Sequence, residues 1–164
     1  MNRPLSLFEI LREVNISGNI MENGETRTRM ISLDGSGCLM TKTTIGSWQK
    51  SHTHKKIKEV LAPQKSWIAY ANQDKKGLNL IQIILPGNFI IIGSEPHNVY
   101  VSANTLLYCI KSCEAPEGEE IDWYPASTEF DQWTQAFHYG RLLEMQQDTK
   151  HHRLCGNPQP LYTH

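Results

Sequence analysis

Between residues 26 and 111 the chain is a succession of short apolar, β-branched segments separated by turn signals. The clearest example is LNLIQIILPGNFIII, in which Pro86-Gly87 divides two such segments. Isoleucine-rich segments of this length favour strands, and many short strands at this spacing are typical of a closed antiparallel barrel or sandwich. The expected strands are Thr26–Leu33, Gly37–Thr44, Ser66–Asn72, Leu78–Leu85, Phe89–Ile92, Val99–Ser102 and Thr105–Lys111.

The segment before these strands has a different pattern. Apolar residues at helical spacing predict a short amphipathic helix over Leu5–Val14, with Ser6 as its N-cap. Asn23-Gly24 then marks a β-hairpin. We expect residues 1–36 to form this helix and hairpin, and residues 37–111 to form the core barrel.

Helical periodicity returns near the C-terminus, after the acidic stretch EAPEGEE. Aromatic and aliphatic residues recur near helical spacing and predict a C-terminal helix over Phe130–Gln146, interrupted at Gly140. The polar tail 148–164 contains two prolines and is expected to be loosely ordered. Residues 112–147 therefore form a loop and a helix, and the whole chain of 164 residues is one domain.

Charge and hydropathy exclude several classes of partner. The formal net charge of −1 provides no global field for nucleic acid or an anionic membrane, and no apolar run is long enough to span a bilayer. The N-terminal residues mix charges with apolar residues, unlike a secretory signal, and the four cysteines are irregularly spaced. We therefore expect a cytoplasmic protein with reduced thiols that binds neither nucleic acid nor membranes.

The residues whose types best suit metal binding or catalysis lie in GSWQKSHTHKKIKE. On a strand His52 and His54 project from the same face, and Glu59 is near enough for a turn to bring it beside them. His97 is placed where a neighbouring antiparallel strand would begin. A His-x-His pair alone is more often a surface or packing feature. Three imidazoles and a carboxylate together indicate a site for Fe, Mn, Ni, Co or Zn.

The same stretch resembles the first motif of the cupin superfamily. Gly46 is followed by five residues, His52-Thr53-His54, four residues and Glu59, and Ser66 stands where the motif ends in glycine. The second motif is degenerate, because only the Pro-Gly pair, Gly93 and His97 match it, with altered spacing. Val101 replaces its asparagine.

The resemblance implies an all-β fold, an antiparallel jelly-roll barrel with a short N-terminal helix and a C-terminal helix. It also implies one divalent transition metal, Fe(II), Mn, Ni or Zn, bound by His52, His54, Glu59 and His97. The expected function is a metal-dependent enzyme for a small organic molecule, of the dioxygenase type. A sugar or keto-acid isomerase or epimerase and a non-catalytic binding or sensing module are the alternatives.

Further expectations concern the pocket and the assembly. Glu59 leaving the metal, or Tyr70, is a candidate general base. The aromatic residues Trp67, Tyr70 and Tyr100 are candidate substrate-pocket residues. Antiparallel sheets must protect their edges, and small cupins often dimerise, so we expect a homodimer.

Overall fold

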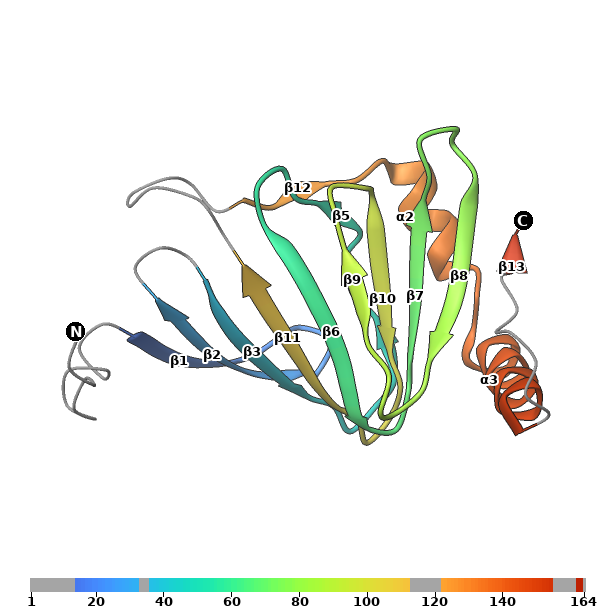
Figure 1. The fold of residues 1–164 in the computed structure, drawn as a ribbon, viewed down its shortest axis with the longest axis horizontal. Helices are drawn as coiled ribbons and strands as arrows, with labels where there is room; N and C mark the ends of the chain where they lie inside the picture. Colours follow the sequence, from blue (N-terminus) through green and yellow to red (C-terminus); the bar gives the residue numbers. More distant parts are fainter. Residues whose placement is uncertain (1–13, 33–35, 113–121, 155–161, 164) are drawn as a thin grey trace, which may run out of the picture.

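The structure is a computed structural model that describes residues 14–32, 36–112, 122–154 and 162–163. Its strands form two antiparallel sheets that face each other as a jelly-roll barrel (Figure 1). The first sheet contains, in spatial order, β1 (Val14–Ile20), β2 (Thr26–Ser32), β3 (Gly37–Lys42), β11 (Leu106–Ser112), β6 (Lys58–Lys65) and β9 (Ile90–Ile92). The second contains β12 (Tyr124–Pro125), β5 (His52–Thr53), β10 (His97–Val101), β7 (Ile68–Gln73), β8 (Asn79–Ile84) and β13 (Tyr162–Thr163), with β4 (Ser47–Trp48) also paired to β10.

The barrel interior is filled by alternate side chains of both sheets. Strand β7 directs Ile68 and Tyr70 inward, and β10 directs Val99 and Val101 inward, because successive side chains of a strand point to opposite faces. The first sheet closes this core from the other side. Its contributions are Leu61, Ile92, Leu107 and Cys109.

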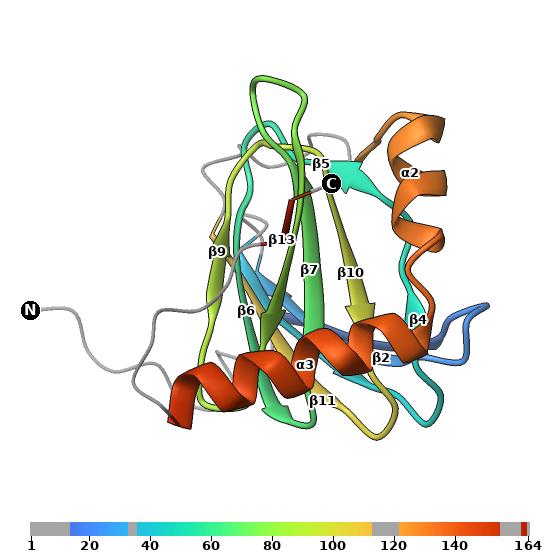
Figure 2. The same ribbon diagram turned by 90° about the vertical axis from the view of Figure 1, so that its right-hand side faces the viewer.

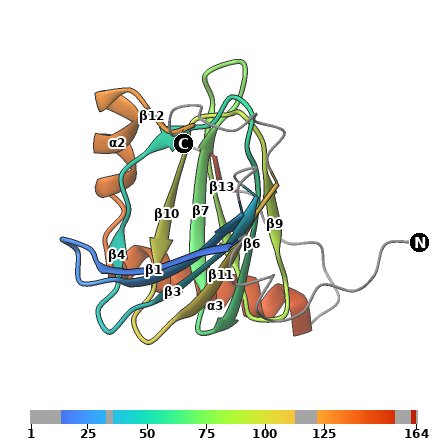
Figure 3. The same ribbon diagram turned by 90° about the vertical axis from the view of Figure 1, so that its left-hand side faces the viewer.

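Two helices cover the outer face of the second sheet: α2 (Thr128–Gln135) and α3 (Tyr139–Leu154) (Figure 2). They pack on the side chains of β7, β8 and β10 that point away from the barrel interior. This second core contains Trp48, Trp67, Ala69, Ala71, Ile81, Ile83, Leu85, Tyr100, Phe130, Leu142 and Met145. Figure 3 shows the opposite side, where β1, β2 and β3 extend the first sheet. Among the described residues no helix has both the length and the apolar character needed to cross a membrane.

The predicted all-β architecture is confirmed, and so is the hairpin at Asn23-Gly24, where Gly24 has a φ of 79°. The sheets nevertheless recruit strands from outside residues 37–111, at both ends of the chain. The predicted helix over Leu5–Val14 lies outside the described residues except for Val14, which begins β1.

The interrupted helix predicted over Phe130–Gln146 is present as two helices, but the predicted place of the interruption, Gly140, is wrong. The break falls at residues 136–138, and Gly140 lies in the first turn of α3. At the break the Phe137 carbonyl accepts a hydrogen bond from Nε1 of Trp48. The predicted loose order from residue 148 is also wrong for 148–154, since α3 continues to Leu154 and Thr149 is buried.

Two positions of the first motif have a structural explanation. Ser66 adopts a φ of 62°, in the left-handed region that glycine occupies at lower cost, which accounts for the glycine of the motif pattern. Gly46 packs so closely that an added Cβ would lie 2.3 Å from the hydroxyl of Tyr100. Gly46 is therefore required by the packing of the β3–β4 turn against β10.

Candidate metal centre

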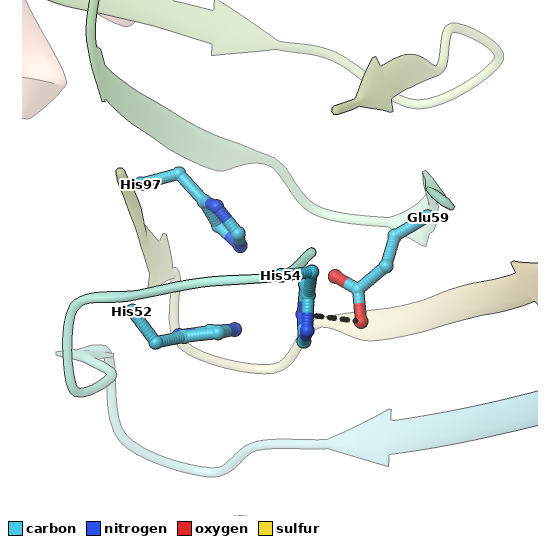
Figure 4. A group of neighbouring side chains, drawn as sticks. All are labelled: His52, His54, Glu59 and His97. Carbon is cyan, nitrogen blue, oxygen red and sulfur yellow. Dashed lines mark ion pairs between the residues drawn. The ribbon is translucent and has the colours of Figure 1, made fainter. Parts of the chain in front are cut away.

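Four side chains from three strands and one adjoining turn point toward one another (Figure 4). His52 lies on β5 and His54 directly follows that strand, while Glu59 lies on β6 and His97 begins β10. His97 is the register partner of His52 across β10 and β5. One potential ligand atom from each residue lies within 4.8 Å of all the others. The structure thus brings together the complete set that the sequence predicts as metal ligands.

Each imidazole uses Nδ1 to contact a backbone carbonyl, which fixes its orientation. Nδ1 of His52 lies 2.9 Å from the carbonyl oxygen of Lys50, and Nδ1 of His97 lies 3.0 Å from that of Glu95. Nδ1 of His54 contacts the carbonyl oxygen of Asp122. Because a carbonyl only accepts, these nitrogens carry the proton in the neutral rings, and each Nε2 keeps its lone pair.

The environment favours the protonation states that bind metals. Burial, followed by the neighbouring His97, lowers the pKa of His52 to about 3. Burial also lowers the pKa of His97. For Glu59, burial raises the pKa, but contacts with His54 and Lys111 outweigh it, so the pKa lies below its ordinary value. The imidazoles of His52 and His97 are therefore neutral and the Glu59 carboxylate is charged near neutral pH.

Among the described residues, two buried side-chain atoms lack a hydrogen-bond partner, Nε2 of His54 and Nε2 of His97. Nε2 of His54 also lies 3.2 Å from Oε1 of Glu59, so two lone-pair donors face each other. Such an arrangement is unfavourable unless a cation lies beside both atoms. Three imidazoles and a carboxylate fit a divalent transition ion, with positions left for water or substrate.

A cavity of about 90 Å³ is lined by three of the four side chains, those of His52, Glu59 and His97. It has room for roughly six to nine water-sized groups if each needs about 10–15 Å³. Two cationic side chains line it. Nζ of Lys111 lies 2.6 Å from Oε1 of Glu59. Arg27 donates to the buried Glu25 from Nε at 2.9 Å, and Gln49 donates to the same carboxylate.

A larger cleft of about 630 Å³ lies between the β1–β2 hairpin, β4, β5 and α2. It shares four lining residues with the inner cavity: Arg27, Gln49, His52 and Trp123. The shared residues place the cleft at the entrance to the metal-site cavity. The indole of Trp123 stacks on the His52 ring at 5.3 Å between centroids, at the junction of the two spaces.

The structure does not place the predicted pocket aromatics at this cavity. Trp67 and Tyr100 stack on each other in the core beneath the helices, on the outer face of the second sheet. Tyr70 points into the barrel, with its ring 6.1 Å from that of His97, but its hydroxyl donates to Glu95 at 3.0 Å. Burial and the nearby Glu95 raise the pKa of Tyr70, which argues against its predicted role as a base.

Sequence reasoning missed the residues that surround the ligands. Lys111 and Arg27 lie on strands of the first sheet, and Asp122 and Trp123 lie next to β12. Burial raises the pKa of Asp122, but backbone N–H groups of Ile57, Lys55 and Lys56 outweigh it and lower that pKa. No local pattern marks these residues, because their proximity depends on pairing between strands far apart in sequence.

No protein-family model and no curated protein matches the chain. Among solved structures, a mutant of Bacillus subtilis oxalate decarboxylase OxdC aligns with a TM-score of 0.57 and 14% identity, over 68% of this chain and 30% of that one. Oxalate oxidase in complex with the substrate analogue glycolate aligns at 0.50 and 14%, over 61% and 57%. The Drosophila melanogaster CENP-C cupin domain aligns at 0.50 and 12%, over 61% and 76%. At these identities the similarity concerns the fold and transfers no activity.

Proposed function

We propose that this protein, which has the cupin fold, is a metal-dependent enzyme of the dioxygenase type that acts on a small organic anion. The observation that carries the proposal is the convergence of two buried Nε2 atoms that lack a hydrogen-bond partner, those of His54 and His97, with His52 and the charged Glu59. Such a set is costly to bury without a cation and matches the ligand preferences of Fe(II), Mn, Ni and Zn.

The four ligands would hold the ion, and the ion would supply redox chemistry with dioxygen or Lewis-acid polarisation of an oxygen atom. The protein's own residues then orient and shield the substrate. The inner cavity is walled by Leu39, Leu61, Val99 and Leu107, which limit the access of water. Substrate enters past Trp123, from the outer cleft.

Charge balance supports an anionic substrate. Arg27 is neutralised by Glu25, and Glu59 is neutralised by Lys111. A divalent ion therefore adds two positive charges to a largely buried cavity whose protein charges already cancel. An uncompensated buried charge is costly, so a small carboxylate or similar anion is the favoured ligand. Oxalate decarboxylase and oxalate oxidase, which share the fold, are named for a small dicarboxylate.

The lining of the inner cavity supports oxygen chemistry over isomerisation. Isomerases and epimerases need a general acid or base beside the reacting carbon. Outside the ligand set, the titratable residues of the described lining are Arg27, Lys111 and Cys109. Arg27 and Lys111 are paired with Glu25 and Glu59, and burial raises the pKa of the Cys109 thiol, so none of the three is a free base. Tyr70 does not line the cavity and is hydrogen-bonded to Glu95.

The contact between Lys111 and Glu59 favours a second candidate function, a metal-free module that binds small anions. At 2.6 Å the ammonium group satisfies the carboxylate without any ion. Lys111 would then bind the anion directly. This candidate belongs to a different class, since it predicts binding without turnover.

Metal content and oxygen uptake together test the proposal. We expect about one transition metal per chain after reconstitution with Fe(II), Mn, Ni or Zn, as one four-ligand site requires. The Fe(II)- or Mn-loaded protein should consume oxygen with at least one member of a panel of small carboxylic acids. His97→Ala is the matched control and should lack both properties. Absence of metal uptake, with retained anion binding, would instead support the metal-free module.

A further inference from the structure

Asp122 makes an unusual set of contacts with the turn that joins two metal-ligand positions. Its carboxylate accepts backbone N–H groups from Lys55 at 3.0 Å, from Lys56 at 2.8 Å and from Ile57 at 2.7 Å. These residues connect His54 to β6, which carries Glu59. Asp122 is only 8% exposed, and the hydrogen bonds to its carboxylate are charge-assisted.

The backbone of the same residue contacts one of the ligands directly. The carbonyl oxygen of Asp122 accepts the Nδ1 proton of His54. Asp122 therefore binds the His54 ring through its main chain and the following turn through its side chain. The adjacent Trp123 stacks on His52, so one short segment contacts two of the three imidazoles.

We propose that Asp122 is a positioning residue for the metal centre. It holds His54 with Nε2 directed toward Glu59 and His97, and it fixes the turn between His54 and Glu59. The proposal rests on the proposed function only for the presence of a metal. The effect of Asp122 on the orientation of the His54 ring does not depend on any ion.

The physical reason is that several hydrogen bonds of one turn depend on the side chain of Asp122. Backbone N–H groups require partners, and three successive ones of this turn share the single carboxylate of Asp122. Without it the turn would rearrange to reach water, and the spacing between the two flanking ligands would change with it. Outer contacts of this kind typically alter metal affinity by about 10–100-fold.

Cobalt(II) binding tests this role, with affinity measured by chelator competition and geometry by visible absorption. Asp122→Ala should bind cobalt(II) about 10–100-fold more weakly than the wild type and with an altered spectrum. Asp122→Asn should lose less, because an amide oxygen at the Oδ2 position still accepts from Lys56 and Ile57.

Asp74 provides the matched control, since its carboxylate also accepts two backbone N–H groups in a turn, those of Lys76 and Leu78, but in the β7–β8 hairpin. Asp74→Ala should leave cobalt(II) affinity unchanged. Equal losses in Asp74→Ala and Asp122→Ala would indicate general destabilisation and overturn the proposal. Wild-type affinity and spectrum in Asp122→Ala would also overturn it.

The tautomer of His54 in the metal-free protein separates this inference from the proposed function. Long-range proton–nitrogen NMR correlations should show Nδ1–H in the wild type. Asp122→Ala keeps the carbonyl of residue 122 but loses the carboxylate that holds this carbonyl against the turn, so the variant should show a mixture of tautomers. An unchanged tautomer in the variant would contradict the positioning role. A changed tautomer in a protein that binds no cobalt(II) would support the positioning role and refute the metal function.

Discussion

Nζ of Lys111 lies 2.6 Å from Oε1 of Glu59, the same oxygen that lies 3.2 Å from Nε2 of His54. Glu59 is therefore shared between a lysine on β11 and the imidazole cluster. A bound metal and the Lys111 ammonium would both interact with the single negative charge of Glu59. This shared carboxylate distinguishes the two proposed functions and leads to the first prediction.

Lys111→Met should make the thermal stability of the protein depend more on bound metal. Removing the ammonium leaves Glu59 buried and unpaired, so the melting temperature of the metal-free protein should fall, by a destabilisation of about 1–3 kcal/mol. Added zinc should then raise the melting temperature more than in the wild type. Thermal unfolding with and without zinc measures both effects. Lys111→Arg keeps the charge and should behave like the wild type, and a zinc response equal in all three proteins would contradict the shared carboxylate.

His54→Ala should abolish metal binding while the barrel remains folded. The core between the sheets contains none of the four ligands, so the fold has a source of stability other than the metal. Elemental analysis gives the metal content, and circular dichroism gives the fold. The exposed His138 provides the control, and His138→Ala should retain metal. If His54→Ala unfolds, the metal is structural.

Acid should destabilise the metal-free protein through His52. Its folded-state pKa is about 3 and its unfolded value is near 6.5. Between these values the unfolded chain binds the extra proton, so stability falls as the pH drops below about 6.5. At pH 5 the loss from this residue is about 1–2 kcal/mol relative to pH 7. Urea unfolding at the two pH values measures it, and His52→Gln should show a smaller difference. Identical pH dependence in both proteins would refute the assignment.

Binding of a paramagnetic metal should quench the fluorescence of Trp123. This indole stacks on the His52 ring and is 39% exposed, whereas Trp48 and Trp67 are buried in the core under the helices. Quenching by an ion held at the cluster falls off steeply with distance. A titration with cobalt(II) should therefore lose most of its fluorescence response in Trp123→Phe, and the Trp133→Phe control should keep it. A full response in Trp123→Phe would place the ion elsewhere.

The predicted homodimer should form through the outer face of the first sheet. A row of side chains, one from each strand, crosses this face and contains no charged residue. Because the six strands lie about 4.8 Å apart, the row is about 24 Å long. An uncharged apolar row is complementary to a second copy of itself, as a two-fold interface requires. The row consists of Ile16, Met30, Cys38, Ile110, Val60 and Ile91, in continuous register.

Light scattering coupled to size exclusion tests this interface. Ile110 is central in the row and 52% exposed, so Ile110→Lys should shift the protein to the monomer mass. Ile45 is 73% exposed but lies in the loop between β3 and β4, and Ile45→Lys should leave the mass unchanged. A wild-type protein of monomer mass would contradict the dimer.

The ligand set could be predicted because it depends on local pattern. His52 and His54 are two residues apart, and Glu59 follows at a separation that one turn can span. His97 was identifiable because it follows the apolar segment that precedes a new strand. The pocket aromatics could not be predicted in the same way. Trp67 and Tyr100 lie on the outer face of the second sheet, and sequence alternation does not say which face a helix covers.

Strand periodicity and turn residues act over a few positions, so they predict a barrel of short antiparallel strands and the four side chains of the candidate metal centre. What surrounds that centre depends on the tertiary structure. Lys111 reaches Glu59 because β11 pairs with β6, and Asp122 reaches His54 because β12 pairs with β5. These pairings join segments about 50 to 70 residues apart. Their register, and therefore the electrostatics of the site, depends on the closed barrel as a whole.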